Sequence, residues 1–139
     1  MPRRWGPAVV LAVLGVVLGV VERNVASPIV FLVLAALVSP RAFPRSVSDA
    51  EARERSSQDG RPIIYWRPGC PFCIRLRARV GRLSRRAHWV DIWADPQGAA
   101  GVRAITGGDE TVPTVVFRGE GFVNPAPARV VEMISSTGR

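Results

Sequence analysis

Cys70 and Cys73 are the residues whose type and spacing are best suited to covalent chemistry. Residues 63–66 before them form a β-branched and aromatic run, and residues 71–86 after them carry apolar side chains at helical spacing. We therefore expect Cys70 at a helix N-terminus, where unpaired N–H groups and the helix dipole favour a thiolate. Cys73 lies within the first turn and on the apolar stripe, from which it can attack a mixed disulfide at Cys70. The pattern predicts a redox pair with Cys70 as the nucleophile.

Two neighbouring residues agree with this interpretation. Arg67 adds positive charge three residues before Cys70, and Pro71 costs no hydrogen bond in a first helical turn. The alternatives to redox chemistry are half of a metal site and a pair of inert buried thiols. Two cysteines and the single histidine, His88, fall one ligand short of a four-ligand zinc site, so no metal site is predicted. We expect His88 to be a strand residue rather than a base, because a helix-terminal thiolate needs none.

Strand and helix patterns alternate through the C-terminal part of the chain. Strands are expected at residues 63–66, 88–93, 114–117 and 122–123, and helices at about 71–86, 96–105 and 125–135. The strand–helix–strand start implies parallel pairing, and the short turn at 118–121 implies an antiparallel hairpin. The fold class is therefore α/β, in the order β-α-β-α-β-β-α. Asp91 is expected to point to solvent, with a buried acid that tunes Cys73 as the alternative, and Asn124 is expected to cap the last helix.

The first 43 residues have a different composition from the rest and predict a membrane anchor. Residues 5–21 carry no charge, and residues 25–40 form a second apolar run after a three-residue polar break. At about 1.5 Å per residue each run reaches roughly 25 Å, close to the hydrocarbon core of about 30 Å. We expect a hairpin of two transmembrane helices that contacts the bilayer through residues 5–40. A signal peptide or single-pass anchor and a buried hairpin of a soluble fold are the alternatives.

Charge sets the expected orientation of this anchor. Four arginines flank the outer ends of the two apolar runs, namely Arg3, Arg4, Arg41 and Arg45, against Arg23 alone in the break. The excess predicts that both ends face the cytoplasm, so the protein is expected in the cell membrane as a multi-pass protein with a cytoplasmic redox domain. Residues 44–60 form a polar linker in which a capping box at Ser48 predicts a short helix over 49–57. Residues 61–139 form the redox domain.

The net charge of +8 comes from 19 arginines, with no lysine, against 11 acidic residues. The arginines of residues 75–86 are expected to be the solvated face of a helix, with attraction to anionic lipid as the alternative. Nucleic acid is not an expected partner, because no aromatic residues are interleaved for stacking and no reader motif is present.

A second motif, Thr111-Val112-Pro113-Thr114, stands at the entry of the third predicted strand. Taken alone, Pro113 is expected to be trans. With the strand–CPxC–helix unit about 40 residues before it, however, residues 62–135 resemble the glutaredoxin branch of the thioredoxin superfamily. The resemblance implies a cis Pro113 that faces the cysteines and a Val112 backbone that binds an incoming thiol or peptide. The substrate- and thiol-binding residues expected on this basis are Arg67, Pro71, Phe72, Thr111, Val112, Pro113 and Asn124.

The segment after Pro113 departs from ordinary glutaredoxins. The Gly-Gly pair and acidic residue that hold glutathione in that family are absent, and Asn124-Pro125 stands in their place. The segment is more similar to mycoredoxins, so mycothiol is favoured over glutathione as the reductant, with no bound cofactor. The resemblance implies a reductase of disulfide-containing or thiolated proteins, and the apolar runs of residues 5–40 are expected to tether it to the membrane. An outward-facing disulfide oxidase or isomerase, an iron–sulfur-binding redoxin and a structural membrane subunit remain alternatives.

Overall fold

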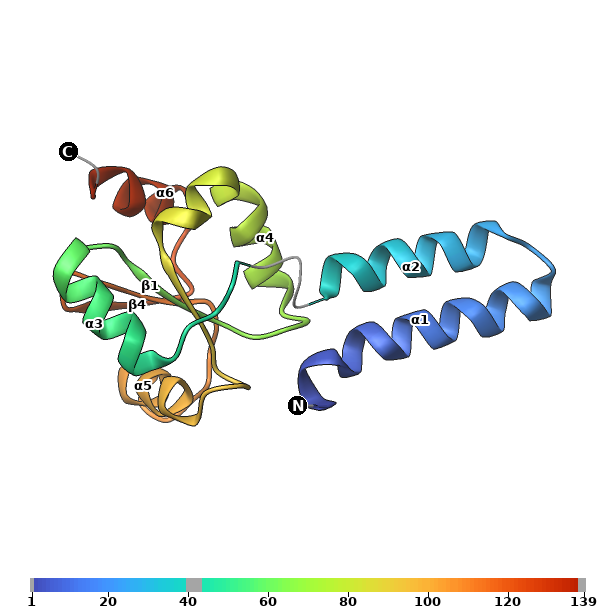
Figure 1. The fold of residues 1–139 in the computed structure, drawn as a ribbon, viewed down its shortest axis with the longest axis horizontal. Coiled ribbons are helices and arrows are strands. Elements are labelled where there is room, and N and C mark those ends of the chain that lie inside the picture. The colour runs from blue at the N-terminus through green and yellow to red at the C-terminus, as the bar shows by residue number, and fades with distance from the viewer. Residues whose placement is uncertain (1, 40–43, 138–139) are drawn as a thin grey trace.

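The structure is a computed structural model that describes residues 2–39 and 44–137. Figure 1 shows a helical hairpin projecting from an α/β domain. The elements are α1 (Pro2–Glu22), α2 (Ala26–Val38), α3 (Asp49–Asp59), β1 (Ile63–Trp66), α4 (Pro71–Val80), the 3₁₀ helix η2 (Gly81–Arg86), β2 (His88–Asp91), α5 (Pro96–Thr106), β3 (Thr114–Phe117), β4 (Glu120–Val123) and α6 (Pro127–Ser136). Pro40 and Arg41, at the end of the predicted second span, lie outside the described residues.

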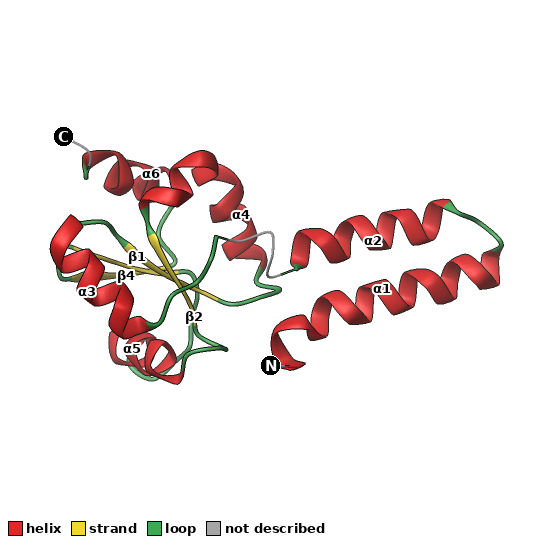
Figure 2. Ribbon diagram, viewed as in Figure 1, coloured by secondary structure: helices red, strands yellow, loops and turns green. Residues whose placement is uncertain are grey.

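The sheet has the strand order β2-β1-β3-β4, with β1 and β2 parallel and the other two pairs antiparallel. This mixed four-stranded α/β sheet confirms the predicted fold class and is consistent with a thioredoxin-like fold. Helices α4 and α6 lie on one side of the sheet and α3 and α5 on the other (Figure 2). All four residues of β1 are buried, as expected for a strand covered on both faces.

The polar linker is part of the domain. Helix α3 begins at the predicted cap, where the Ser48 side chain accepts from the Glu51 N–H, and Ala52 on this helix is fully buried. Tyr65 in β1 donates to Asp49 Oδ1 at 2.6 Å, so a fully buried phenol finds its partner on α3. Trp66 Nε1 donates to Ser46 Oγ at 2.9 Å. Residues 46–59 are therefore held against the sheet by both apolar and polar contacts.

Three local expectations were wrong. The helix expected over 71–86 ends at Val80, because Gly81 has a φ of +54° and the chain continues as a 3₁₀ helix. Asn124 is not the cap of the last helix; it has a φ of +45°, and α6 begins three residues later with Ala126 as its N-cap. Asp91 does not point to solvent. It is 1% exposed, and its Oδ1 accepts from the Trp93 N–H at 3.0 Å.

Helices α1 and α2 pack against each other through small residues. A Cβ atom on Gly15 would lie 2.4 Å from Cβ of Phe31, and one on Gly19 would lie 2.8 Å from Pro28, so both glycines permit close approach of the two helices. Most large apolar side chains of the hairpin remain exposed. Helix α1 is long and apolar enough to cross a membrane over Trp5–Glu22, whereas the apolar part of α2 is shorter. Signal sequences have the same length and composition.

Candidate functional site

The two cysteines lie where β1 gives way to α4. Cys70 is the N-cap residue of this helix, and its Sγ accepts a hydrogen bond from the Cys73 N–H at 3.3 Å. Pro71 occupies the first turn and has no N–H, so the free donors that face the sulfur come from Phe72 and Cys73. Both cysteines are free thiols in the structure. The helix therefore presents its unpaired donors to Cys70, as the sequence predicts.

The site gives the two thiols opposite acidities. The side-chain hydrogen bond from Cys73 is the largest influence on the pKa of Cys70. The backbone N–H groups of Cys73 and Phe72 and the charge of Arg67 act in the same direction. Together these contributions outweigh the effect of burial and lower the pKa of Cys70 to about 6. The same hydrogen bond, together with burial and the charge of Cys70, raises the pKa of Cys73. Cys70 is 5% exposed and Cys73 is fully buried. Cys70 is thus the thiolate at neutral pH, and Cys73 holds the proton.

The Val112–Pro113 segment faces the cysteines from the entry of β3. The Val112–Pro113 peptide bond is cis, which confirms the expectation drawn from the family resemblance. Cys70 Sγ lies 3.5 Å from the carbonyl oxygen of Val112, to which the thiol form donates. The segment is held on both sides, because Thr114 Oγ1 donates to the Thr111 carbonyl at 2.7 Å and the Asn124 N–H donates to the Pro113 carbonyl at 2.8 Å.

A cavity of about 280 Å³ opens beside this segment. It brings together three residues predicted for substrate binding, Phe72, Pro113 and Asn124. Arg75 also lines it, although the sequence predicted only a solvated helix face there. The signal was available, because Arg75 lies three residues after Phe72 and so shares its side of α4.

A second cavity, of about 690 Å³, is lined by Cys70 itself. The domain contributes Arg67, Pro71 and Trp93 to its lining, with the guanidinium of Arg67 5.9 Å from the ring centroid of Trp93. The first turns of α1 form the opposite wall through Gly6, Pro7, Val10 and Leu11. No pattern in the sequence indicates that the hairpin adjoins the thiols.

The remaining predicted site residue, Thr111, lines neither cavity, and its carbonyl positions the loop instead. Within residues 2–39 and 44–137, no group of three or more histidine, cysteine or acidic side chains is placed to hold a metal ion. The site can attack a substrate disulfide with the Cys70 thiolate and resolve the resulting mixed disulfide with Cys73.

The fold and the thiol pair are consistent with a thioredoxin-like domain that carries a dithiol site. Residues 63–123, which run from β1 to β4, match the family model described as Glutaredoxin. The match supports placing this part of the chain in the glutaredoxin and thioredoxin-like group, and with it a thiol–disulfide oxidoreductase-like function. A comparison with curated proteins found no match.

Proposed function

We propose that this protein is a membrane-tethered oxidoreductase that reduces protein disulfides, or mixed disulfides with a small thiol, on the cytoplasmic face of the cell membrane, with mycothiol as the reductant. One observation carries the proposal: the Cys70 sulfur accepts hydrogen bonds from the Cys73 side chain and from the free N–H donors at the start of α4. Together they lower the pKa of Cys70 to about 6 beside a protonated, fully buried Cys73.

The reaction begins with attack of the Cys70 thiolate on one sulfur of a substrate disulfide. A mixed disulfide forms at Cys70, and the other substrate sulfur leaves as a thiolate that takes a proton from solution. Forming this bond removes the negative charge from Cys70, and that charge is one of the causes that raise the pKa of Cys73. Cys73 then loses its proton to the departing substrate sulfur as it attacks Cys70 Sγ. The substrate leaves as a thiol, and the Cys70–Cys73 disulfide that remains is reduced by two equivalents of the small thiol.

A small thiol can resolve the Cys70 adduct instead. The 280 Å³ cavity beside Pro113 is placed for this thiol, with Arg75 and Asn124 as its polar lining. No carboxylate lines this cavity, so the α-ammonium group of glutathione finds no counter-charge there. One unmatched buried polar group costs about 1–3 kcal/mol, which corresponds to a preference of roughly five- to 150-fold for a thiol without that group. This supports mycothiol over glutathione.

The membrane proposal rests on the apolar hairpin. Large apolar side chains stay exposed along both helices, as on Val21 of α1 and Ile29 of α2, and lipid would cover them. We propose that both helices cross the bilayer with the two chain ends cytoplasmic. Under this proposal Cys70, which lines the 690 Å³ cavity together with the first turns of α1, lies near the membrane surface. Membrane-bound proteins with disulfides near that surface are the substrates this arrangement favours.

The proposal is tested with full-length protein in lipid nanodiscs. A protein substrate carrying a mixed disulfide is supplied with either mycothiol or glutathione, and turnover is compared between wild type and Cys70→Ser. We expect turnover in wild type alone and faster turnover with mycothiol. Equal rates with the two thiols would overturn the choice of mycothiol, and activity that survives in Cys70→Ser would overturn the reductase itself. Protease added to intact cells should spare the redox domain; its digestion would overturn the orientation.

A further inference from the structure

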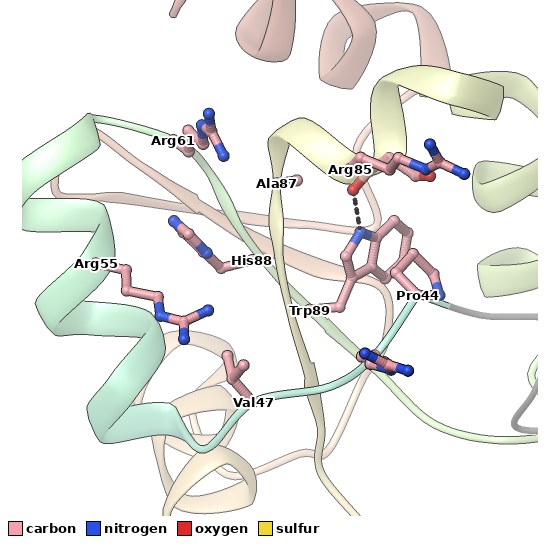
Figure 3. A pocket seen from close by; sticks show the side chains of 10 residues that line it. Pro44, Val47, Arg55, Arg61, Arg85, Ala87, His88 and Trp89 are labelled. Carbon is pink, nitrogen blue, oxygen red and sulfur yellow. Dashed lines mark hydrogen bonds between the residues drawn. The ribbon is translucent and has the colours of Figure 1, made fainter.

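A third cavity, of about 570 Å³, lies away from the thiols, between α3, β2 and η2. Four arginines line it together with His88, and Figure 3 labels three of them, Arg55, Arg61 and Arg85. The four are Arg45, Arg55, Arg61 and Arg85. They come from four segments, namely the chain before α3, α3 itself, the loop before β1, and η2. Their convergence is therefore a product of the fold and not of one basic stretch of sequence.

The walls of this cavity are held by specific hydrogen bonds. The Val47 N–H donates to the Trp89 carbonyl at 2.9 Å, which fixes the chain next to Arg45 along the outer edge of β2, an edge strand of the sheet. Trp89 Nε1 donates to the Ser84 carbonyl at 2.9 Å, which fixes η2 next to Arg85 (Figure 3). Trp89 itself is almost fully buried. The backbone that carries these two arginines is thus anchored to the sheet.

The cavity has a surplus of positive charge. Arg55 pairs with Glu51 at 2.5 Å, and Arg61 lies 3.6 Å from Asp59, a carboxylate that also bonds His88. Neither Glu51 nor Asp59 lines the cavity. Arg45 and Arg85 have no carboxylate partner among residues 2–39 and 44–137. Two guanidinium groups therefore line the same cavity without a carboxylate partner, and like charges repel one another.

The positive surface extends beyond this cavity. A neighbouring hollow of about 320 Å³ shares Ser84 and Arg85 with it and adds Arg77 and Arg82. The Nε atom of Arg77 is buried there without a hydrogen-bond partner in the structure, although its Nη1 donates to the Gly81 carbonyl at 3.0 Å. A buried donor of this kind is a place for an anionic acceptor.

From these observations we propose that the arginine cavity binds a phosphate group. Guanidinium forks match phosphate oxygens in a bidentate geometry, and several of them can share one doubly charged anion. The group can belong to free phosphate or to an anionic phospholipid. Arg45 lies a few residues after the end of α2, so the second source is close if the hairpin spans a membrane. The site is independent of the thiols, and its failure would leave the proposed reductase untouched.

Residue-specific arginine modification tests the site in the full chain. The protein is placed in phosphatidylcholine nanodiscs and treated with phenylglyoxal, and modification of Arg45 and Arg85 is read by mass spectrometry. Exposed Arg79 on α4 lines none of these cavities and is the internal control. One arm adds inorganic phosphate against chloride at equal ionic strength, and a second replaces part of the lipid with phosphatidylglycerol and adds no phosphate.

We expect at least a fivefold slower modification of Arg45 and Arg85, with Arg79 unchanged, in one of the two arms. Protection by phosphate identifies a free ligand, and protection by phosphatidylglycerol identifies a lipid headgroup. The double variant Arg45→Gln/Arg85→Gln should weaken phosphate or lipid binding at least tenfold and keep its disulfide reductase rate. The variant Arg79→Gln/Arg118→Gln loses the same charge elsewhere and should bind normally. Protection in neither arm, or equal loss of binding in both double variants, would overturn the site.

Discussion

Replacing Cys73 with alanine should raise the pKa of Cys70 more than any other single change near the thiols. The pKa of Cys70 lies at about 6, against 9.0 for an ordinary thiol, and the side chain of Cys73 is the largest cause. A hydrogen bond to a charged group contributes about 1.5–3 kcal/mol, which is about one to two pKa units. The backbone N–H of Cys73 stays in Cys73→Ala. We therefore expect a pKa of about 7–8 for Cys70 in this variant.

The assay is the rate of Cys70 alkylation by iodoacetamide from pH 4 to 10, read by intact mass. At pH 6 the thiolate fraction should fall from about one half to about a tenth or less in Cys73→Ala. Arg67→Gln is the matched comparison, because the charge of Arg67 is the smallest of the causes that lower the pKa of Cys70. This variant should shift the midpoint of the alkylation curve by less than one pH unit. A midpoint that stays near 6 in Cys73→Ala, or one that moves further in Arg67→Gln, would refute the assigned order of causes.

Three further predictions concern the fold. Tyr65→Phe removes the donor to buried Asp49 Oδ1 and should lower the free energy of unfolding by about 1–3 kcal/mol in urea titrations of the full chain. An unchanged midpoint would show that Arg53 alone satisfies this carboxylate. The pKa of Asp59 is lowered because hydrogen bonds from the Arg61 N–H and His88 outweigh its burial, so the free energy of unfolding should fall as the pH drops through the acid range. Asp59→Asn should flatten that part of the pH–stability curve. An unchanged curve in this variant would show that the ion pair contributes nothing. Gly15→Val would place its Cβ 2.4 Å from Cβ of Phe31 and should separate the two hairpin helices. A loss of disulfide crosslinking between cysteines introduced on α1 and α2 would report this separation. Gly6→Val, whose Cβ would meet no atom of another element within 4 Å, should crosslink as the parent does.

Local signals made much of the sheet and its thiol site predictable. The apolar run of β1, the Pro71 that opens α4 and the capping box of α3 each act through their immediate neighbours, and all three elements begin where the sequence indicates. Asp91 shows where such reasoning ends. Its burial depends on the turn after β2, where the Trp93 N–H finds its acceptor, and no local pattern encodes that turn.

The parts of the candidate sites that were missed all depend on contacts between distant segments. The arginine cavity needs η2 and the chain before α3 to meet across β2, nearly 40 residues apart in sequence. The cavity beside Cys70 needs the first turns of α1 to approach the β1–α4 loop. The role of Asn124 was also misread, because its positive φ suits a turn beside Pro113 and not a helix cap.

Trapping the reaction intermediate tests the central claim most directly. Full-length Cys73→Ser, Cys70→Ser and wild-type protein are each mixed with one equivalent of a mixed-disulfide peptide, quenched with acid, and analysed by intact mass and peptide mapping. The proposed mechanism predicts a stable peptide adduct on Cys70 in Cys73→Ser, no adduct in Cys70→Ser, and a Cys70–Cys73 disulfide with released peptide in wild type. An adduct on Cys73, or equal adducts on the two single variants, would contradict the assignment of Cys70 as the nucleophile.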